Sequence, residues 1–223
     1  MTLAEIDFAR LYRDQVAQSG RPRREPAYWD RRAAAMSGST FQSSYTASFL
    51  DRLDLNGCRT LLDVGCGPGT IGLSVADRLD RIYGLDYSPA MLAAFVAQAG
   101  QRGVTNATAL QRAWEDDWSD VPVCAVVVAS RATAVSDFEA AARKMIAKAA
   151  RRVYLTYPAR GRFVGDEACR AIGRSREPLP DYLYVVGILH HLGVDPRIDY
   201  LDEPGRFATC LDPEAFVRKM GGY

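Results

Sequence analysis

A glycine-rich turn directly after a short apolar run organises this chain. Residues 61–72 read LLDVGCGPGTIG, so an apolar strand must bend sharply at Gly65, Gly67 and Gly69 before a helical stretch begins. Glycine reaches positive φ at little cost and carries no Cβ atom, so the backbone of such a turn can approach a ligand closely. We therefore expect a ligand-binding loop at this position.

The sequence beyond this turn alternates between helical stretches and short apolar runs. Helical patterns cover residues 70–79 and 88–102, and a capping box at residues 136–139 opens a third helix. Such alternation is typical of a parallel sheet flanked by helices. The five apolar runs expected to form its strands lie at residues 59–64, 81–86, 107–111, 123–130 and 152–158.

The residues before and after this region are organised differently. Helical spacing recurs at residues 3–18, 28–36 and 42–54. We expect residues 1–55 to form an N-terminal helical arm, or lid, and residues 56–223 to form the ligand-binding domain. Within that domain, residues 160–195 are expected to form an insert that covers the substrate, and residues 197–210 a hairpin or a bent strand.

Composition argues against several classes of partner. The 28 basic and 27 acidic residues give a formal charge of +1, so no nucleic-acid partner is expected. The longest apolar run, Val121 to Ala129, has nine residues where a membrane span needs about 20, so we expect a cytoplasmic protein without a membrane partner. Five cysteines without a C-x-x-C pair, together with two histidines, indicate no metal site and no disulfide framework.

The glycines alone fit two kinds of ligand. Gly67, Gly69 and Gly72 satisfy the G-x-G-x-x-G fingerprint of dinucleotide-binding proteins, so a nicotinamide-dependent oxidoreductase is one interpretation. Asp63, however, places a carboxylate beside the turn, where it would repel a pyrophosphate but attract a ligand carrying an ammonium and a sulfonium, by direct contact or through the loop's amides. Pro68 also removes an amide that a phosphate would use. The charge therefore favours a cationic ligand.

The run Asp63-Val-Gly65-Cys-Gly67-Pro-Gly69 resembles the first motif, acidic-x-G-x-G-x-G, of the class I S-adenosylmethionine-dependent methyltransferases. The resemblance covers residues 58–158. It implies an α/β, Rossmann-like, doubly wound and mostly parallel seven-stranded sheet with helices on both faces. It also implies S-adenosyl-L-methionine as the cofactor, S-adenosyl-L-homocysteine as the product, and methyl transfer by in-line displacement. The acceptor that we expect is a small molecule.

The resemblance also implies where the cofactor lies. In that family the glycine loop wraps the methionine part, and a carboxylate at the end of the second strand holds the ribose hydroxyls, a role that Asp86 fits. The family's acid after the third strand corresponds to Ala113, so the adenine contact is expected to pass to Glu115 or Asp116, with Trp114 either stacking on the base or packing against the sheet edge. The expected cofactor-binding residues are Asp63, Gly65, Cys66, Gly67, Pro68, Gly69, Asp86, Tyr87, Ser88, Met91, Trp114, Glu115 and Ser130.

Two of these residues have a second interpretation as structural residues. Ser88 and Pro89 form an N-cap and N1 pair that starts the helix after Asp86. Met91, in the first turn of that helix, is either an adenine contact or a core residue.

The acceptor pocket is expected beyond the carboxyl ends of the strands. We expect Tyr28, Tyr45, Arg131 and Tyr157 to line it. Tyr28 and Tyr45 have a second interpretation, in which they pack the arm onto the sheet. Arg131 has one as part of a loop that leads into a helix, and Tyr157 has one as an ordinary strand residue. A general base is optional for methyl transfer from a sulfonium, because alignment of the reactants supplies much of the rate. The candidates for one are Tyr157 and His190, and His190 has a second interpretation as a residue that interacts with the carbonyls at a helix C-terminus.

Two absences argue against methylation of nucleic-acid bases. Enzymes of this fold that methylate exocyclic amines carry an [Asn/Asp/Ser]-Pro-Pro-aromatic motif after the fourth strand, where this chain reads SRAT at residues 130–133. Enzymes that methylate C5 of cytosine place Pro-Cys there, whereas Cys124 lies inside an apolar run. A non-catalytic binding module remains an alternative because the acid expected at Ala113 is missing. We expect a monomer or a homodimer.

Overall fold

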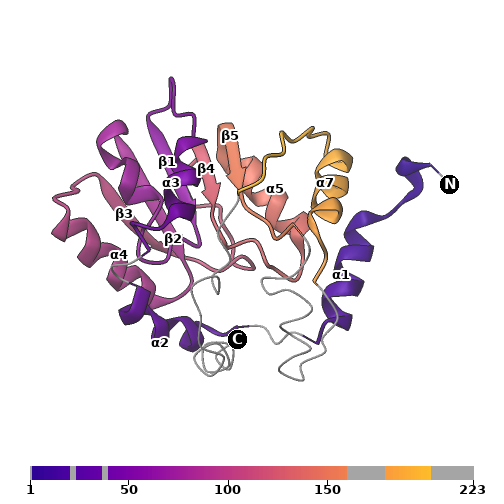
Figure 1. The fold of residues 1–223 in the computed structure, drawn as a ribbon, viewed down its shortest axis with the longest axis horizontal. Helices are drawn as coiled ribbons and strands as arrows, with labels where there is room; N and C mark the ends of the chain where they lie inside the picture. The colour runs from indigo at the N-terminus through magenta and orange to yellow at the C-terminus, as the bar shows by residue number, and fades with distance from the viewer. Residues whose placement is uncertain (1, 21–23, 37–39, 160–178, 202–223) are drawn as a thin grey trace.

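Five parallel strands form the centre of the protein. The computed structural model describes residues 2–20, 24–36, 40–159 and 179–201 (Figure 1). Neighbouring strands pair in the order β3-β2-β1-β4-β5, and each pairing is parallel. The strands are β1 (Thr60–Val64), β2 (Arg81–Asp86), β3 (Ala107–Gln111), β4 (Cys124–Ala129) and β5 (Ala149–Leu155). The five predicted strands and the α/β fold are therefore confirmed.

Helical segments precede β1, lie between three of the four pairs of consecutive strands and follow β5. They are η1 (Leu3–Glu5), α1 (Phe8–Gln18), α2 (Pro26–Met36), α3 (Ser44–Asp51), η2 (Gly72–Arg78), α4 (Pro89–Gln101), α5 (Phe138–Lys148) and α7 (Tyr182–His191). No helix in the part of the chain that the structure describes is long and apolar enough to cross a membrane.

The two faces of the sheet are covered by different helices, as a doubly wound fold requires. On one face, Leu61 and Ile82 pack with residues of α3 and η2, and α4 packs beside them against β2 and β3. On the other face, Leu62 and Met145 pack together, the latter from α5. Leu61 and Leu62 are fully buried because β1 lies between β2 and β4 and is covered on both sides. A continuous apolar run is the pattern expected of such a strand.

Two of the expected helices differ in detail. The helix predicted over 70–79 is a 3-10 helix, η2, which Val75 interrupts with a φ of −120°. The side-chain amide of Asn106 donates to the carbonyl oxygens of Ala76 and Leu79, so the end of η2 is tied to the segment that enters β3. The capping box predicted at residues 136–139 is also wrong, because Asp137 is the N-cap of α5 and accepts from the Ala140 N–H at 3.0 Å.

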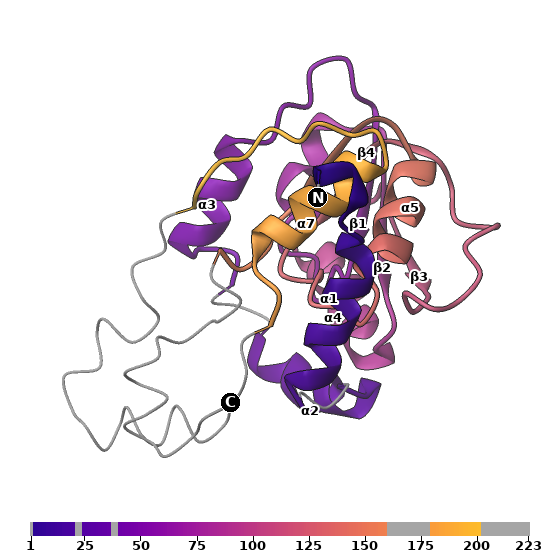
Figure 2. The same ribbon diagram turned by 90° about the vertical axis from the view of Figure 1, so that its right-hand side faces the viewer.

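The predicted N-terminal arm contains parts that pack in different places. The helix expected over 3–18 is divided into η1 and α1, because Asp7 starts a new helix by accepting from the Arg10 N–H at 2.9 Å. Figures 1 and 2 show α1 running beside α7, whereas α2 lies below α4. Tyr12 of α1 is buried in a cluster with Phe138 of α5 and Ile188 of α7. The division into a 1–55 lid and a 56–223 domain stays a prediction.

The remaining predictions for the C-terminal part concern residues that the structure describes only partly. The insert expected at 160–195 includes α7, and residues 160–178 lie outside the described part. The hairpin expected at 197–210 has no strand in residues 197–201, and residues 202–210 lie outside the described part. The sixth and seventh strands therefore stay predictions.

Candidate cofactor site

The glycine loop forms a tight turn at the carboxyl end of β1. Gly65, Gly67 and Gly69 have φ values of 64°, 53° and 88°, which side chains rarely permit. A Cβ atom on Gly65 would lie 2.4 Å from the Cβ of Ala132, in the segment after β4. The N–H of Gly65 donates to the carbonyl of Leu85 at 2.7 Å. The loop is therefore held between the ends of β2 and β4.

Asp63, in β1, stabilises this loop through a buried hydrogen bond. Its residue is 2% exposed, and its Oδ2 accepts from the Gly72 N–H at 2.9 Å. A Cβ atom on Gly72 would lie 3.1 Å from the same oxygen, so the third glycine of the dinucleotide fingerprint makes room for a carboxylate. Burial, with a smaller contribution from the neighbouring Asp86 carboxylate, raises the pKa of Asp63 to about 7, although the hydrogen bond from the Gly72 N–H opposes this rise. Of the two roles considered for Asp63, the structure supports the one through the loop's amides.

This arrangement also bears on the dinucleotide interpretation. A pyrophosphate binds at a helix N-terminus through unpaired N–H groups and the helix dipole. Here the Gly72 N–H is already bonded to Asp63, and the following segment is an interrupted 3-10 helix. The glycine loop therefore does not lead into the helix N-terminus that a pyrophosphate would use.

Asp86 ends β2 and faces the glycine loop. Its Oδ2 accepts from the Gly67 N–H at 2.9 Å, and its Oδ1 accepts from the Ser88 N–H at 2.9 Å. Burial raises the pKa of Asp86, and the Asp30 carboxylate contributes. A carboxylate has about four lone-pair sites, so this one has the capacity to accept from a pair of ligand hydroxyls as well.

Asp30 is a residue that sequence reasoning missed. It lies on α2, and its Oδ1 accepts from the Ser88 Oγ–H at 2.6 Å and from the Ala90 N–H at 3.3 Å. Through these bonds α2 is joined to the first turn of α4, directly beside Asp86. Nothing in the local pattern PAYWDRRAAAM marks this aspartate, because its partners lie 58 and 60 residues away.

Several expected cofactor residues lie inside the protein. Ser88 is buried and also accepts from the Met91 N–H at 3.1 Å, which confirms its role as an N-cap. Met91 is buried in the first turn of α4, consistent with its interpretation as a core residue. Cys66 packs against Phe95, and burial raises the pKa of its thiol. Tyr87 is half-buried and its hydroxyl donates to the carbonyl of Arg24, while Pro68 is buried in the loop.

The loop after β3 contains the residues expected near adenine. The Trp114 Nε1–H donates to the Ala132 carbonyl at 3.2 Å, and its ring stacks on Trp118 with centroids 5.3 Å apart. Trp118 is buried under the sheet, so this geometry agrees with the packing interpretation of Trp114. Glu115 is exposed on the same loop, and Asp116 accepts from the Ala113 N–H at 2.7 Å.

Two expected pocket residues, Tyr45 and Arg131, meet the expected cofactor residue Ser130 beyond β4 and β5. The hydroxyl of Tyr45, on α3, lies 2.8 Å from Ser130 Oγ and 3.0 Å from Thr156 Oγ1. The guanidinium of Arg131 lies over the Tyr45 ring, 3.6 Å from its centroid. Sequence reasoning missed Thr156, although it lies at the expected end of the last strand in the run RVYLTYP.

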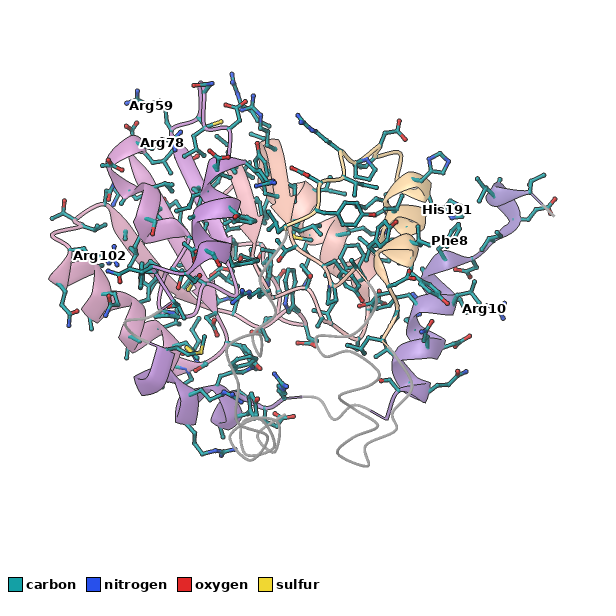
Figure 3. All side chains as sticks on the ribbon, in the orientation of Figure 1. Phe8, Arg10, Arg59, Arg78, Arg102 and His191 are labelled. Atoms are coloured by element: carbon teal, nitrogen blue, oxygen red, sulfur yellow. The ribbon has the colours of Figure 1, made fainter. Side chains whose placement is uncertain are left out.

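The other expected pocket and base residues lie elsewhere. The Tyr157 hydroxyl donates to that of Tyr12 at 3.3 Å, within the cluster of α1, α5 and α7. Tyr28 lies on α2, under the guanidinium of Arg24. His190 is at the end of α7, where its side chain is 61% exposed and lies 3.5 Å from Asp195. Figure 3 shows its neighbour, His191, close to Phe8 and on the opposite side of the molecule from α4.

The glycine loop and Asp86 belong to a segment with known relatives. Residues 61–154, from β1 into β5, match a family described as methyltransferase domain. These residues form a methyltransferase domain, whose fold and first motif are those of the class I S-adenosylmethionine-dependent methyltransferases. S-adenosylmethionine is accordingly the cofactor of this methyltransferase.

The methyltransferase is similar to several individual proteins. It is 32% identical to an uncharacterized protein of Haemophilus influenzae over 218 residues, which are 97% of this chain and 80% of that protein. It is 39% identical to the 18S rRNA (guanine(1575)-N(7))-methyltransferase of Saccharomyces cerevisiae over 71 residues, 30% of this chain and 26% of that protein. Among solved structures, it is similar in fold to the magnesium protoporphyrin IX methyltransferase of Synechocystis with bound S-adenosylhomocysteine, with a TM-score of 0.56, 18% identity, and coverage of 88% of this chain and 90% of that one.

Proposed function

We propose that this methyltransferase transfers a methyl group from S-adenosylmethionine to a small-molecule acceptor bound beyond the carboxyl ends of β4 and β5. The observation that carries the cofactor part is the pair of buried carboxylates, Asp63 and Asp86, each bonded to an amide of the glycine loop. The negative charge of these carboxylates, which Asp63 carries above its pKa of about 7, suits a ligand with an ammonium and a sulfonium. The same charge disfavours a pyrophosphate.

Different residues would bind different parts of this cofactor. Asp86 would accept from the ribose hydroxyls, and the glycine loop would surround the methionine part. The bound cofactor supplies a methyl group that is already activated by the sulfonium. The chain therefore contributes mainly alignment and the exclusion of water. Asp30 supports this by joining α2 to α4 next to Asp86.

A small acceptor is supported by the charge balance of the chain. With a formal charge of +1, the protein has no basic excess for binding the phosphate backbone of a nucleic acid. The RNA substrate in the yeast relative's name belongs to a protein of which this chain matches 26%. The hydroxyl and guanidinium groups around Tyr45 fit a compact polar acceptor.

Calorimetry with S-adenosylhomocysteine and NADH tests the proposal. We expect S-adenosylhomocysteine to bind and NADH not to bind. Asp86→Ala should weaken that binding by about 2 to 3 kcal/mol, or about 30- to 150-fold, because charge-assisted hydrogen bonds are lost. Asp77→Ala, at an exposed carboxylate on η2, is the control and should bind as the wild type does. Preferential NADH binding, or an unchanged dissociation constant in Asp86→Ala, would reject the assignment.

A further inference from the structure

The strand order locates the crevice in which the two reactants meet. In a doubly wound sheet, ligands bind at the point where the chain changes direction across the sheet, beyond the carboxyl ends of the strands. In the order β3-β2-β1-β4-β5 that point lies between β1 and β4. The glycine loop follows β1, and Ser130 and Arg131 follow β4. The two segments approach each other where Ala132 faces Gly65.

Arg131 has an unusual backbone conformation at this crevice. Its φ is 58°, and it is the one non-glycine residue with positive φ in the ranges that the structure describes. That conformation is strained for a residue with a side chain, because its Cβ crowds the carbonyl oxygen of the backbone. The Arg131 N–H donates to Thr156 Oγ1 at 2.9 Å, which helps to hold the backbone there. Strain of this kind is concentrated at functional sites, where surrounding contacts fix a side chain in a required position.

The guanidinium of Arg131 rests on a rigid platform. It stacks over the ring of Tyr45, which is buried and whose hydroxyl is fixed by Ser130 and Thr156. Stacking uses the flat face of a guanidinium, whereas its N–H donors lie in the plane at the rim. Arg131 is exposed to solvent in spite of this contact. A stacked, exposed guanidinium has the geometry for binding a carboxylate or a phosphate through two parallel hydrogen bonds.

The charges on the two sides of the crevice are opposite. Asp63 and Asp86 are carboxylates that lie behind and beside the glycine loop, on the β1 and β2 side. Arg131 places a permanent positive charge on the β4 side. A cationic cofactor and an anionic acceptor would therefore each meet a group of opposite charge.

We propose that Arg131 is a specificity-determining residue that binds an anionic group, a carboxylate or a phosphate, on the small-molecule acceptor. This inference rests on the proposed function and adds the chemical class of its substrate. Tyr45 serves as the platform for the guanidinium, and the hydroxyls of Ser130 and Thr156 fix the platform.

Matched pairs of small molecules test this with the full chain saturated with S-adenosylhomocysteine. Calorimetry compares benzoate with benzamide and phenyl phosphate with phenol, so the two arms separate carboxylate from phosphate recognition. We expect the anion of at least one pair to bind about tenfold or more tightly than its neutral partner. Arg131→Gln should remove this preference, and Arg131→Lys should restore part of it because the charge returns without the fork. The dissociation constant of S-adenosylhomocysteine should stay unchanged in both variants.

A control and a second variant keep the test decisive. Arg59→Gln, at a side chain that is 78% exposed and directly before β1 at the opposite end of the sheet (Figure 3), should keep the preference. If Arg131→Gln fails to fold, Arg131→Gly replaces it, because glycine adopts a φ of 58° without strain. Equal binding of anionic and neutral compounds, or a preference that survives loss of the guanidinium, overturns the inference. Failure of S-adenosylhomocysteine to bind rejects the proposed function instead.

Discussion

Replacing Asp63 with asparagine tests whether a proton on a buried carboxyl group stabilises the fold. Asparagine has nearly the same shape and keeps a side-chain oxygen that accepts from the Gly72 N–H. It has no group that ionises, so it removes the cost of burying a charge. The perturbation is therefore confined to the ionisation of one side chain that is 2% exposed.

The size of the effect follows from the raised pKa. Burial raises the pKa of Asp63 from 3.8 to about 7, so the folded state binds its proton more tightly than the unfolded chain does. The resulting stabilisation is fully present below about pH 4, is lost as the pH rises to about 7, and is absent above that. The full range corresponds to about 4 kcal/mol, of which about 2 to 3 kcal/mol falls between pH 5 and pH 7.

Urea unfolding of the wild type and of Asp63→Asn at pH 5 and pH 8 measures this quantity. Titrating groups whose pKa does not depend on Asp63 cancel when the two proteins are compared at the same pH. The free energy of unfolding of Asp63→Asn, relative to the wild type, should rise by about 2 to 3 kcal/mol between the two pH values. Asp77→Asn, at an exposed position, serves as the control and should show no such change. An equal difference at pH 5 and pH 8 would refute the reasoning about the buried proton.

Two further predictions concern the loop and the arm. Gly69→Ala should lower the free energy of unfolding by about 3 kcal/mol or more, since its Cβ would lie 2.6 Å from Leu73 Cδ1 at a φ of +88°, whereas Gly103→Ala, with a φ of +67° and nothing within 4 Å, should cost about 1 kcal/mol. Equal losses in denaturant titrations would contradict this crowding argument. Asp30→Ala should speed hydrogen exchange of the α2 amides, because the bond to Ser88 is lost, and leave α1 unchanged. Unaltered protection of α2 would show that other contacts hold it.

The sheet was predictable because fully buried parallel strands leave a local signal. The run around Val127 is continuously apolar, and the glycine loop that follows the run around Leu61 marks the ligand side. The 3-10 form of η2 was not predictable, because apolar spacing at residues 70–79 does not distinguish it from an α-helix. The carbonyl oxygen of Ala76, directly after the break at Val75, accepts from Asn106, which lies outside the segment.

The candidate site was predictable in its residue types and less so in its connections. Asp63 and Asp86 were found from their spacing to the glycines, but only the structure shows that each accepts from a loop amide. Asp30 left no signal because it acts through Ser88, far along the chain. Trp114 and Tyr157 had two interpretations each. The sequence around an aromatic residue that follows a strand does not show whether its ring packs in the core or contacts a ligand.

The central place of β1 has a consequence for synthesis on the ribosome. β1 pairs with β2, which follows within 20 residues of chain, and with β4, which ends about 65 residues after β1 does. At usual translation rates, that interval corresponds to about 3 to 13 s. During this time one edge of a strand containing Leu61 and Leu62 has no partner, although both residues are fully buried in the finished protein. Aggregation of nascent chains should therefore be greatest for truncations that end between β3 and β4.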